Sequence, residues 1–212
     1  MERPRRTKLS ITNLLRRGVP KDFISNTVDD LDSYGSPERE ETLDYIRNYI
    51  NNLPSELNKN HGLFLYGSNG VGKSFIASLI VKEAYICRYT SRRCTFVDYV
   101  SKYTDLWKIK DKEILEEEEG LFYHNYKSVD FLVIEEIGKE IDSKISASVL
   151  EDLLRYREEH GLVTIICANL TPKEIVEKYG NSVGSLIKGN FTPIKLVGKD
   201  KRINSFSKKV GE

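Results

Sequence analysis

The chain has 212 residues and carries 33 lysine and arginine side chains against 32 aspartate and glutamate side chains, which leaves a formal net charge of +1. This length is enough for one well-buried α/β domain with some residues left over at the ends, so a second full domain is not expected. The nearly neutral balance excludes a protein whose overall charge drives nucleic-acid binding, and any basic contact surface must be local. Such surfaces are predicted at both ends, because basic residues outnumber acidic ones in residues 1–21 and 195–209.

Three cysteines, Cys87, Cys94 and Cys167, show no CxxC spacing, and the three histidines have no metal-ligand spacing. This pattern favours reduced thiols in a reducing cytoplasm and argues against a structural metal ion. The N-terminus lacks the apolar core of a signal peptide, and no stretch approaches the roughly 18 apolar residues of a membrane span. We therefore expect a soluble cytoplasmic protein that has no membrane partner.

Periodic apolar positions predict alternating helices and strands after a basic N-terminal arm at residues 1–35. In chain order, we expect a helix over 36–53, a strand at 63–66, a helix over 75–89, a strand at 94–97, helical segments over 99–126, a strand at 131–134, a helix over 143–160, a strand at 162–167, a helix over 171–180, a further short helix, and a last strand near 194–197. The strands are almost continuously apolar, which is typical of a parallel sheet with helices on both faces. Ligands of such α/β proteins bind at the carboxyl ends of the strands.

The segment GSNGVGKS matches the phosphate-binding loop pattern GxxxxGK[ST] and lies between a predicted strand and a predicted helix. Its glycines let successive backbone N–H groups point at phosphate oxygens, and the following helix adds its positive end. In this pattern, the Lys73 ammonium reaches the β- and γ-phosphates, and the Ser74 hydroxyl ligates Mg²⁺. The candidate nucleotide-binding residues are Gly67, Ser68, Asn69, Gly70, Val71, Gly72, Lys73, Ser74 and Phe75.

Two carboxylates, Glu135 and Glu136, follow the apolar strand predicted at 131–134. In a phosphate-loop ATPase, the first acid of such a pair holds Mg²⁺ through water, and the second orients the attacking water. The alternative is a strand that simply emerges into solvent. Glu135 stands where aspartate is usual, and its extra methylene shifts the carboxylate by about one carbon–carbon bond, so we expect altered metal geometry and slower turnover.

Asn169 follows a third apolar strand, and its amide can hydrogen-bond the γ-phosphate or the attacking water. The alternative is an ordinary loop residue beside the helix cap predicted at Thr171. If the strand tips meet, Asn169 joins Lys73 and Glu136 in a set of residues that activates water.

Five segments occur in order between Gly18 and Arg202, and they define a region of roughly residues 19–203: GVPKDF, GLFLYGSNGVGKSFIASLIVKEA, VDFLVIEEIG, TIICANLTPKEI and GKDKR. With them the chain resembles the AAA+ ATPases of the bacterial and phage replicative helicase loader type, DnaC and DnaI, to which the transposition helper IstB is related. The resemblance implies an ASCE-type core with a five-stranded parallel sheet at residues 36–203, followed by a basic tail at 204–212. It also implies ATP and Mg²⁺ as cofactors, ATP-dependent self-association into an open spiral, and binding of single-stranded DNA and of a hexameric replicative helicase.

The resemblance also assigns roles by position. Lys73 and Ser74 match the Walker A residues, Glu135 and Glu136 the Walker B pair, Asn169 sensor 1, and Arg202 the sensor 2 arginine that contacts nucleotide. The alternative for Arg202 is a solvated charge in a basic tail.

Two features depart from this family. Its members place arginines after the position of Gly180, one of them acting on the ATP of a neighbouring subunit, whereas this chain has no arginine between Arg157 and Arg202. Lys188 or a partner protein would have to substitute. Typical loaders also carry a separate helicase-binding domain, and here only the arm of about 35 residues stands in its place. We interpret the chain as a compact phage or mobile-element loader in which ATP acts as an assembly switch.

Two other functions fit the same ATPase core: a transposition helper that binds duplex DNA, and an ATP-bound adaptor or inhibitor of the helicase that does not hydrolyse ATP. The arm offers either a helix face for the helicase, formed by Leu9, Ile11, Leu14 and Leu15, or arginines that bind DNA phosphates.

DNA contacts are also expected in residues 99–126 from side chains of the types that stack on bases or bind the backbone, namely the aromatic residues Tyr103, Trp107, Phe122 and Tyr123 and the lysines Lys102, Lys108 and Lys110. The alternative is that aromatic residues at this helical spacing belong to the core. The acidic run at 116–119 argues against the second half of this segment, because it would repel phosphate. Lys139 and Lys144 are an alternative contact pair.

The missing arginine generates a testable prediction. Because such a residue accelerates hydrolysis by about 10³- to 10⁵-fold where it has been measured, we expect the purified protein alone to hydrolyse ATP slowly. A phosphate-release assay with and without candidate partners checks this, and rapid turnover by the isolated protein would contradict it.

Overall fold

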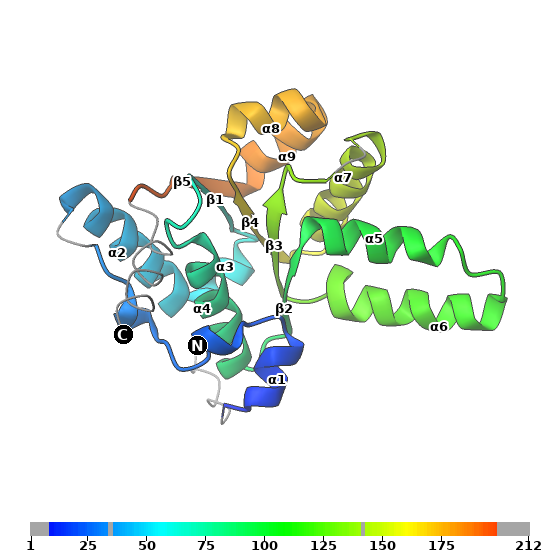
Figure 1. The fold of residues 1–212 in the computed structure, drawn as a ribbon, viewed down its shortest axis with the longest axis horizontal. Helices are drawn as coiled ribbons and strands as arrows, with labels where there is room; N and C mark the ends of the chain where they lie inside the picture. Colours follow the sequence, from blue (N-terminus) through cyan, green and yellow to red (C-terminus); the bar gives the residue numbers. More distant parts are fainter. Residues whose placement is uncertain (1–8, 34–35, 141–142, 199–212) are drawn as a thin grey trace, which may run out of the picture.

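The computed structural model describes residues 9–33, 36–140 and 143–198. Its centre is a five-stranded parallel sheet in the order β2-β3-β4-β1-β5 (Figure 1). The strands are β1 (Gly62–Tyr66), β2 (Ser91–Thr95), β3 (Phe131–Ile137), β4 (Val163–Ala168) and β5 (Phe191–Lys195). The parallel α/β sheet expected from the sequence is thus confirmed.

Helices connect these strands. The α-helices are α1 (Ile11–Arg16), α2 (Pro37–Asn51), α3 (Leu53–Asn58), α4 (Lys73–Ile86), α5 (Phe96–Leu106), α6 (Lys112–Phe122), α7 (Ser143–Glu159), α8 (Pro172–Tyr179) and α9 (Asn181–Asn190). Shorter turns are η1 (Lys21–Phe23), η2 (Val28–Asp30) and the π-helical η3 (Tyr123–Lys127). Among these described helices, none is both long enough and apolar enough to cross a membrane.

Successive residues of the inner strands alternate between two hydrophobic clusters, one on each face of the sheet. In β3, Phe131 and Val133 enter the first cluster, whereas Leu132 and Ile134 enter the second. Buried side chains of α2 and α4 complete the first cluster, and those of α5, α7, α8 and α9 complete the second. Because both faces are buried, these strands read as continuous apolar runs in the sequence.

The edge strand β2 ends earlier than the strand predicted at 94–97. It is an edge strand whose residues after Ser91 are only partly buried, so it tolerates polar residues such as Arg92 and Arg93. These arginines conceal the start of the strand when only apolar runs are used to predict strands. Its end is set by Thr95, whose side chain caps α5 by accepting a hydrogen bond of 3.1 Å from the Asp98 N–H.

The opposite edge strand, β5, also lies earlier than the strand predicted near 194–197. It contains Pro193, which has no N–H to donate and is therefore tolerated only at a sheet edge or a bulge. β5 pairs with β1 alone, so the proline costs the sheet no hydrogen bond on its paired side.

The helical segment expected over 99–126 forms a hairpin of α5 and α6, which pack together and extend away from the sheet (Figure 1). The aromatic residues expected to contact DNA fall into two groups. Phe122 is buried in the second cluster, where its ring lies 5.8 Å from that of the half-buried Tyr103. Trp107 and Tyr123 are 60% and 40% exposed. Two of the four aromatic candidates are therefore mainly core residues.

The described part of the predicted arm, residues 9–33, packs against the domain. Leu14 is fully buried in the first cluster, together with Val19 and Leu31, whereas Leu9 and Ile11 are 46% and 62% exposed. The expectation of a helix face that presents four leucine or isoleucine side chains is therefore wrong at Leu14. Its side chain anchors α1 to the core and leaves a smaller exposed apolar face.

Arg157 of α7 is fully buried and holds together the turn that leads into β3. Its guanidinium donates to the Thr164 hydroxyl (2.8 Å) and to the backbone carbonyls of Lys127 (2.9 Å), Val129 (2.8 Å), Asp130 (3.4 Å) and Val163 (2.6 Å). These acceptors lie beside β3 and β4, so one side chain closes the end of the sheet opposite the strand tips.

We expect Arg157→Met to lower the free energy of unfolding by about 3 kcal/mol or more, because several buried carbonyls lose their donor. Arg155→Met is the matched control: Arg155 is half-exposed and bonds Glu151 and Ser182 at the surface, so its loss should cost less than about 1 kcal/mol. Urea denaturation followed by circular dichroism measures both, and equal effects would contradict this assignment.

Candidate nucleotide site

The candidate site lies where three neighbouring strands end. β3, β4 and β1 are adjacent and parallel, so the residues after each strand meet at one edge of the sheet. A cavity of about 750 Å³ opens there. Among the predicted site residues, those that line it are Asn69, Gly70, Gly72, Lys73, Ser74, Phe75, Glu135, Glu136 and Asn169. The structure therefore brings together most of the predicted set. Gly67, Ser68 and Val71 belong to the same loop but do not line the cavity, and Arg202 lies outside the described residues.

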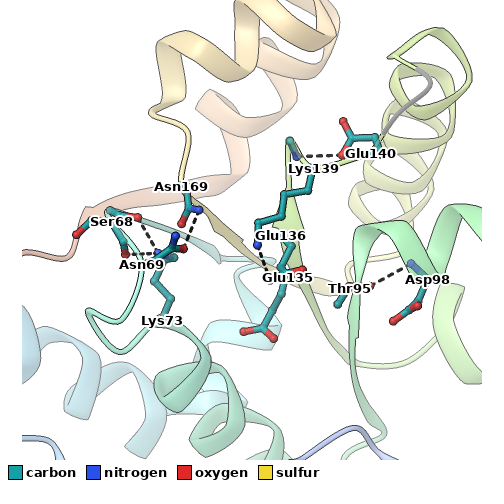
Figure 2. Close-up of polar contacts among 12 residues, drawn as sticks. Ser68, Asn69, Lys73, Thr95, Asp98, Glu135, Glu136, Lys139, Glu140 and Asn169 are labelled. Carbon is teal, nitrogen blue, oxygen red and sulfur yellow. Dashed lines mark hydrogen bonds and ion pairs between the residues drawn. The ribbon is translucent and has the colours of Figure 1, made fainter. Parts of the chain in front are cut away.

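The phosphate-binding loop uses its glycines as the sequence predicts. Gly67, Gly70 and Gly72 have φ values of +146°, +75° and +106°, a region that residues with a Cβ rarely adopt. The Lys73 ammonium lies within the loop and donates to the carbonyls of Gly67 and Ser68, each at 2.7 Å (Figure 2). Helix α4 begins at Lys73, so its positive end points into the cavity.

Arg39 of α2 braces this loop, and the sequence analysis missed it. Its side chain is buried and donates to the Val71 carbonyl (3.2 Å), to the Asp32 carbonyl (3.0 Å) and to the Val197 carbonyl. One signal was present in the sequence: an arginine in the first turn of a helix, where acidic residues are favoured, requires a reason of its own.

Glu135 is 4% exposed, and its Oε2 atom forms an ion pair with Nη2 of Arg93 on β2. Its Oε1 atom has no hydrogen-bond partner among the described residues. Burial raises the pKa of the Glu135 carboxyl, although the Arg93 charge and the Ser74 hydroxyl act in the opposite direction. Arg93 was not predicted as a site residue. The sequence does place two adjacent arginines on the strand that pairs with β3, which carries the predicted carboxylates.

The donor atoms around Glu135 fit a hard divalent cation. An unpartnered carboxylate oxygen and a nearby serine hydroxyl at the head of a phosphate-binding loop are the oxygen ligands that Mg²⁺ prefers. Such an ion would compete with the Arg93 guanidinium, which already occupies the other oxygen of the carboxylate.

Glu136 differs from Glu135 in exposure and backbone. Its φ is +61°, unusual for a residue with a side chain, and the pairing between β3 and β4 shifts register around it. The bulge turns its carboxylate out of the sheet, where it forms an ion pair of 2.7 Å with Lys139 (Figure 2). Strained backbone of this kind is often found at functional sites. Lys139, which was predicted as a DNA contact, is thus paired with Glu136, the carboxylate expected to orient the attacking water.

Asn169 lies directly after β4 and reaches the phosphate-binding loop. Its Nδ2 donates to Oδ1 of Asn69 at 3.0 Å, so the two loops are joined side chain to side chain (Figure 2). Both amides line the cavity. The sequence predicted Asn169 and Asn69 at the site but not this contact.

The other end of the cavity is formed by residues before α2. Asp22, Phe23, Asn26 and Asp30 line it, and the Phe23 ring meets the Phe75 ring edge-on, with centroids 5.4 Å apart. An aromatic pair beside a phosphate-binding loop suits the apolar faces of a nucleotide base. Phe23 lies in the segment GVPKDF, which the sequence analysis noted without assigning it to the site.

Comparison with known proteins gives one clear relative in sequence. No protein-family model matches the chain. The chain is 26% identical over 159 residues to the replicative helicase loader DnaI of Bacillus subtilis (strain 168), a match that covers 74% of this chain and 48% of that protein. It therefore spans about half the length of this relative.

Solved structures show the same fold. The crystal structure of the DnaC helicase loader matches with a TM-score of 0.67 and 17% identity, and the match covers 84% of this chain and 100% of that one. The replication initiator DnaA, bound to AMPPCP and single-stranded DNA, matches with a TM-score of 0.65 and 16% identity over 91% of this chain and 55% of that one. The fold is thus that of the AAA+ P-loop proteins, as expected.

We expect Glu136→Gln to leave ATP binding within about threefold of the original protein while lowering hydrolysis by about 10²-fold or more, because the amide keeps the size of the side chain but cannot accept a proton. Glu177→Gln, on the exposed face of α8, is the matched control and should change neither quantity. Titration with a fluorescent ATP analogue and a phosphate-release assay measure them. If the Glu136 variant hydrolysed ATP at an unchanged rate, Glu136 would have no role in the reaction.

Proposed function

Because this chain is a homologue of the helicase loader DnaI and shares the fold of DnaC, we propose that it is an ATPase that loads a replicative DNA helicase onto single-stranded DNA. The observation that carries this proposal is the sequence match to DnaI, combined with strand tips that meet around one cavity. ATP binding serves mainly as the switch for assembly with the helicase and with further copies of the chain.

In the proposed site, Lys73 and the loop N–H groups bind the β- and γ-phosphates, and Phe23 and Phe75 contact the base. Ser74 and Glu135 hold Mg²⁺, which supplies charge neutralisation at the phosphates. Glu136 accepts the proton of the attacking water, while Asn169 orients that water or the γ-phosphate.

One feature of the chain supports slow hydrolysis. It lacks an arginine between Arg157 and Arg202, so a neighbouring copy offers none from that segment. The ion pair between Glu136 and Lys139 is exposed and opens at little cost, so it adds no comparable barrier. The missing arginine favours ATP as a switch of assembly over ATP as a source of work.

Two surfaces are available for the proposed partners. Leu9, just before α1, and Ile11 and Leu15 on α1 are 46%, 62% and 46% exposed, and this apolar surface suits a groove on the helicase. The exposed Trp107 directly follows α5, before the chain enters α6, and it can stack on a base of single-stranded DNA.

The proposal is tested by native mass spectrometry of the protein mixed with the replicative helicase of its host, with Mg²⁺ and the non-hydrolysable analogue AMPPCP. We expect a defined complex with the helicase hexamer, and we expect Lys73→Ala to lose it together with nucleotide binding. If the protein forms no complex with the helicase but assembles on duplex DNA, the proposed function changes from a loader to a transposition helper. If the complex forms but ATP turnover stays near zero with DNA present, the proposed function changes to an adaptor.

A further inference from the structure

Arg93 connects the candidate metal site to the N-terminal segment. One of its guanidinium nitrogens, Nη2, forms the ion pair with Glu135, while Nη1 donates to the Gly18 carbonyl at 2.7 Å. Its backbone N–H donates to the Arg17 carbonyl at 2.8 Å. A single residue of β2 therefore holds Glu135 on one side and the end of α1 on the other.

The N-terminal segment lies close against the outer edge of β2. A Cβ at Gly18, whose φ is +86°, would lie 2.1 Å from the Arg93 carbonyl oxygen, so only glycine permits this approach. The neighbouring Arg92 donates to the Arg16 carbonyl at 2.5 Å and to the Tyr126 hydroxyl at 2.8 Å, but it has no contact with Glu135 among those the structure shows. Of the two arginines, Arg93 is therefore the one that contacts both Glu135 and Gly18.

Glu135 cannot serve Arg93 and a divalent cation equally. Its side chain is buried, and two cationic centres at one buried carboxylate repel each other at short range, where solvent screens them poorly. When a metal–nucleotide complex takes up the unpartnered Oε1, the ion pair at Oε2 weakens. The guanidinium then becomes free to move, and its hydrogen bond to Gly18 moves with it.

We propose that Arg93 is a positioning residue that couples metal–nucleotide occupancy at Glu135 to the docking of residues 11–18 on the sheet edge. This inference rests on the proposed function, because it needs Mg²⁺ and nucleotide at this cavity. It deepens that function by naming the route of regulation. The segment that carries the exposed Leu9, Ile11 and Leu15 side chains is held against the sheet edge when Arg93 bonds Gly18, and it is more mobile when that bond is lost.

The test is hydrogen–deuterium exchange of the full chain with AMPPCP and Mg²⁺, with AMPPCP in EDTA, and without nucleotide. We expect exchange of the peptide that covers residues 11–19 to rise about threefold or more with Mg²⁺ and AMPPCP, but not in EDTA. In Arg93→Gln, this peptide should exchange at the raised rate in every condition, because the bond to Gly18 is lost from the start while the buried Leu14 still anchors α1.

Two further variants keep the test decisive. Arg92→Gln removes a contact to the same segment without touching Glu135, so it should keep the Mg²⁺-dependent response. Arg93→Lys keeps a positive charge beside Glu135 but cannot span both partners, so it should fold with normal thermal stability and still lose the response. If Arg93→Gln fails to fold, Arg93→Lys tests the coupling in its place.

The outcomes separate this inference from the proposed function. Calorimetric binding of AMPPCP is measured on the same samples. If the original protein binds the complex but exchange at residues 11–19 does not change, or if Arg92→Gln loses the response as Arg93→Gln does, the coupling is overturned while the nucleotide site stands. If no binding occurs, the proposed function fails and the coupling falls with it.

Discussion

The site depends on one constraint: β3, β4 and β1 are neighbours that run in the same direction. Their carboxyl ends share an edge, so residues separated by about a hundred positions, such as Asn69 and Asn169, meet through hydrogen-bonding side chains. The helices that cover both faces bury the strands and stabilise this order. A different strand order would separate the phosphate-binding loop from its acidic pair.

Charge balance is the second organising feature. Each candidate acid has a cationic partner from the same chain, Arg93 for Glu135 and Lys139 for Glu136, but the two pairs differ in kind. The Glu135 pair is buried, so removing one partner would leave an uncompensated charge. The Glu136 pair is exposed to solvent on both sides and opens at little cost. The Glu135 pair therefore opens only when another cation compensates the carboxylate, whereas the Glu136 pair opens without such a replacement.

The inner strands and the cavity residues could be predicted from the sequence because their signals are local. In an apolar run such as Phe131–Ile134, or in the glycine pattern of the phosphate-binding loop, a few consecutive residues are enough to determine the local structure. Contacts between distant segments could not be predicted. Arg39 and Arg93 look like surface charges until the fold shows Arg39 buried against carbonyls and Arg93 mostly covered beside a carboxylate. The edge strands were misplaced for a related reason, since one open side removes the need for apolar residues.

The two borders of the sheet also limit how copies of this chain can associate. On one border, the Arg93 N–H is already used by the Arg17 carbonyl, and Gly18 leaves no room for another backbone. On the other, Pro193 interrupts the row of donors that a further strand would need. Neither border offers a continuous template for an added strand, which protects the protein from edge-to-edge aggregation. Within the described residues, ordered assembly is therefore favoured through helices and loops, where side chains rather than backbone select the neighbour.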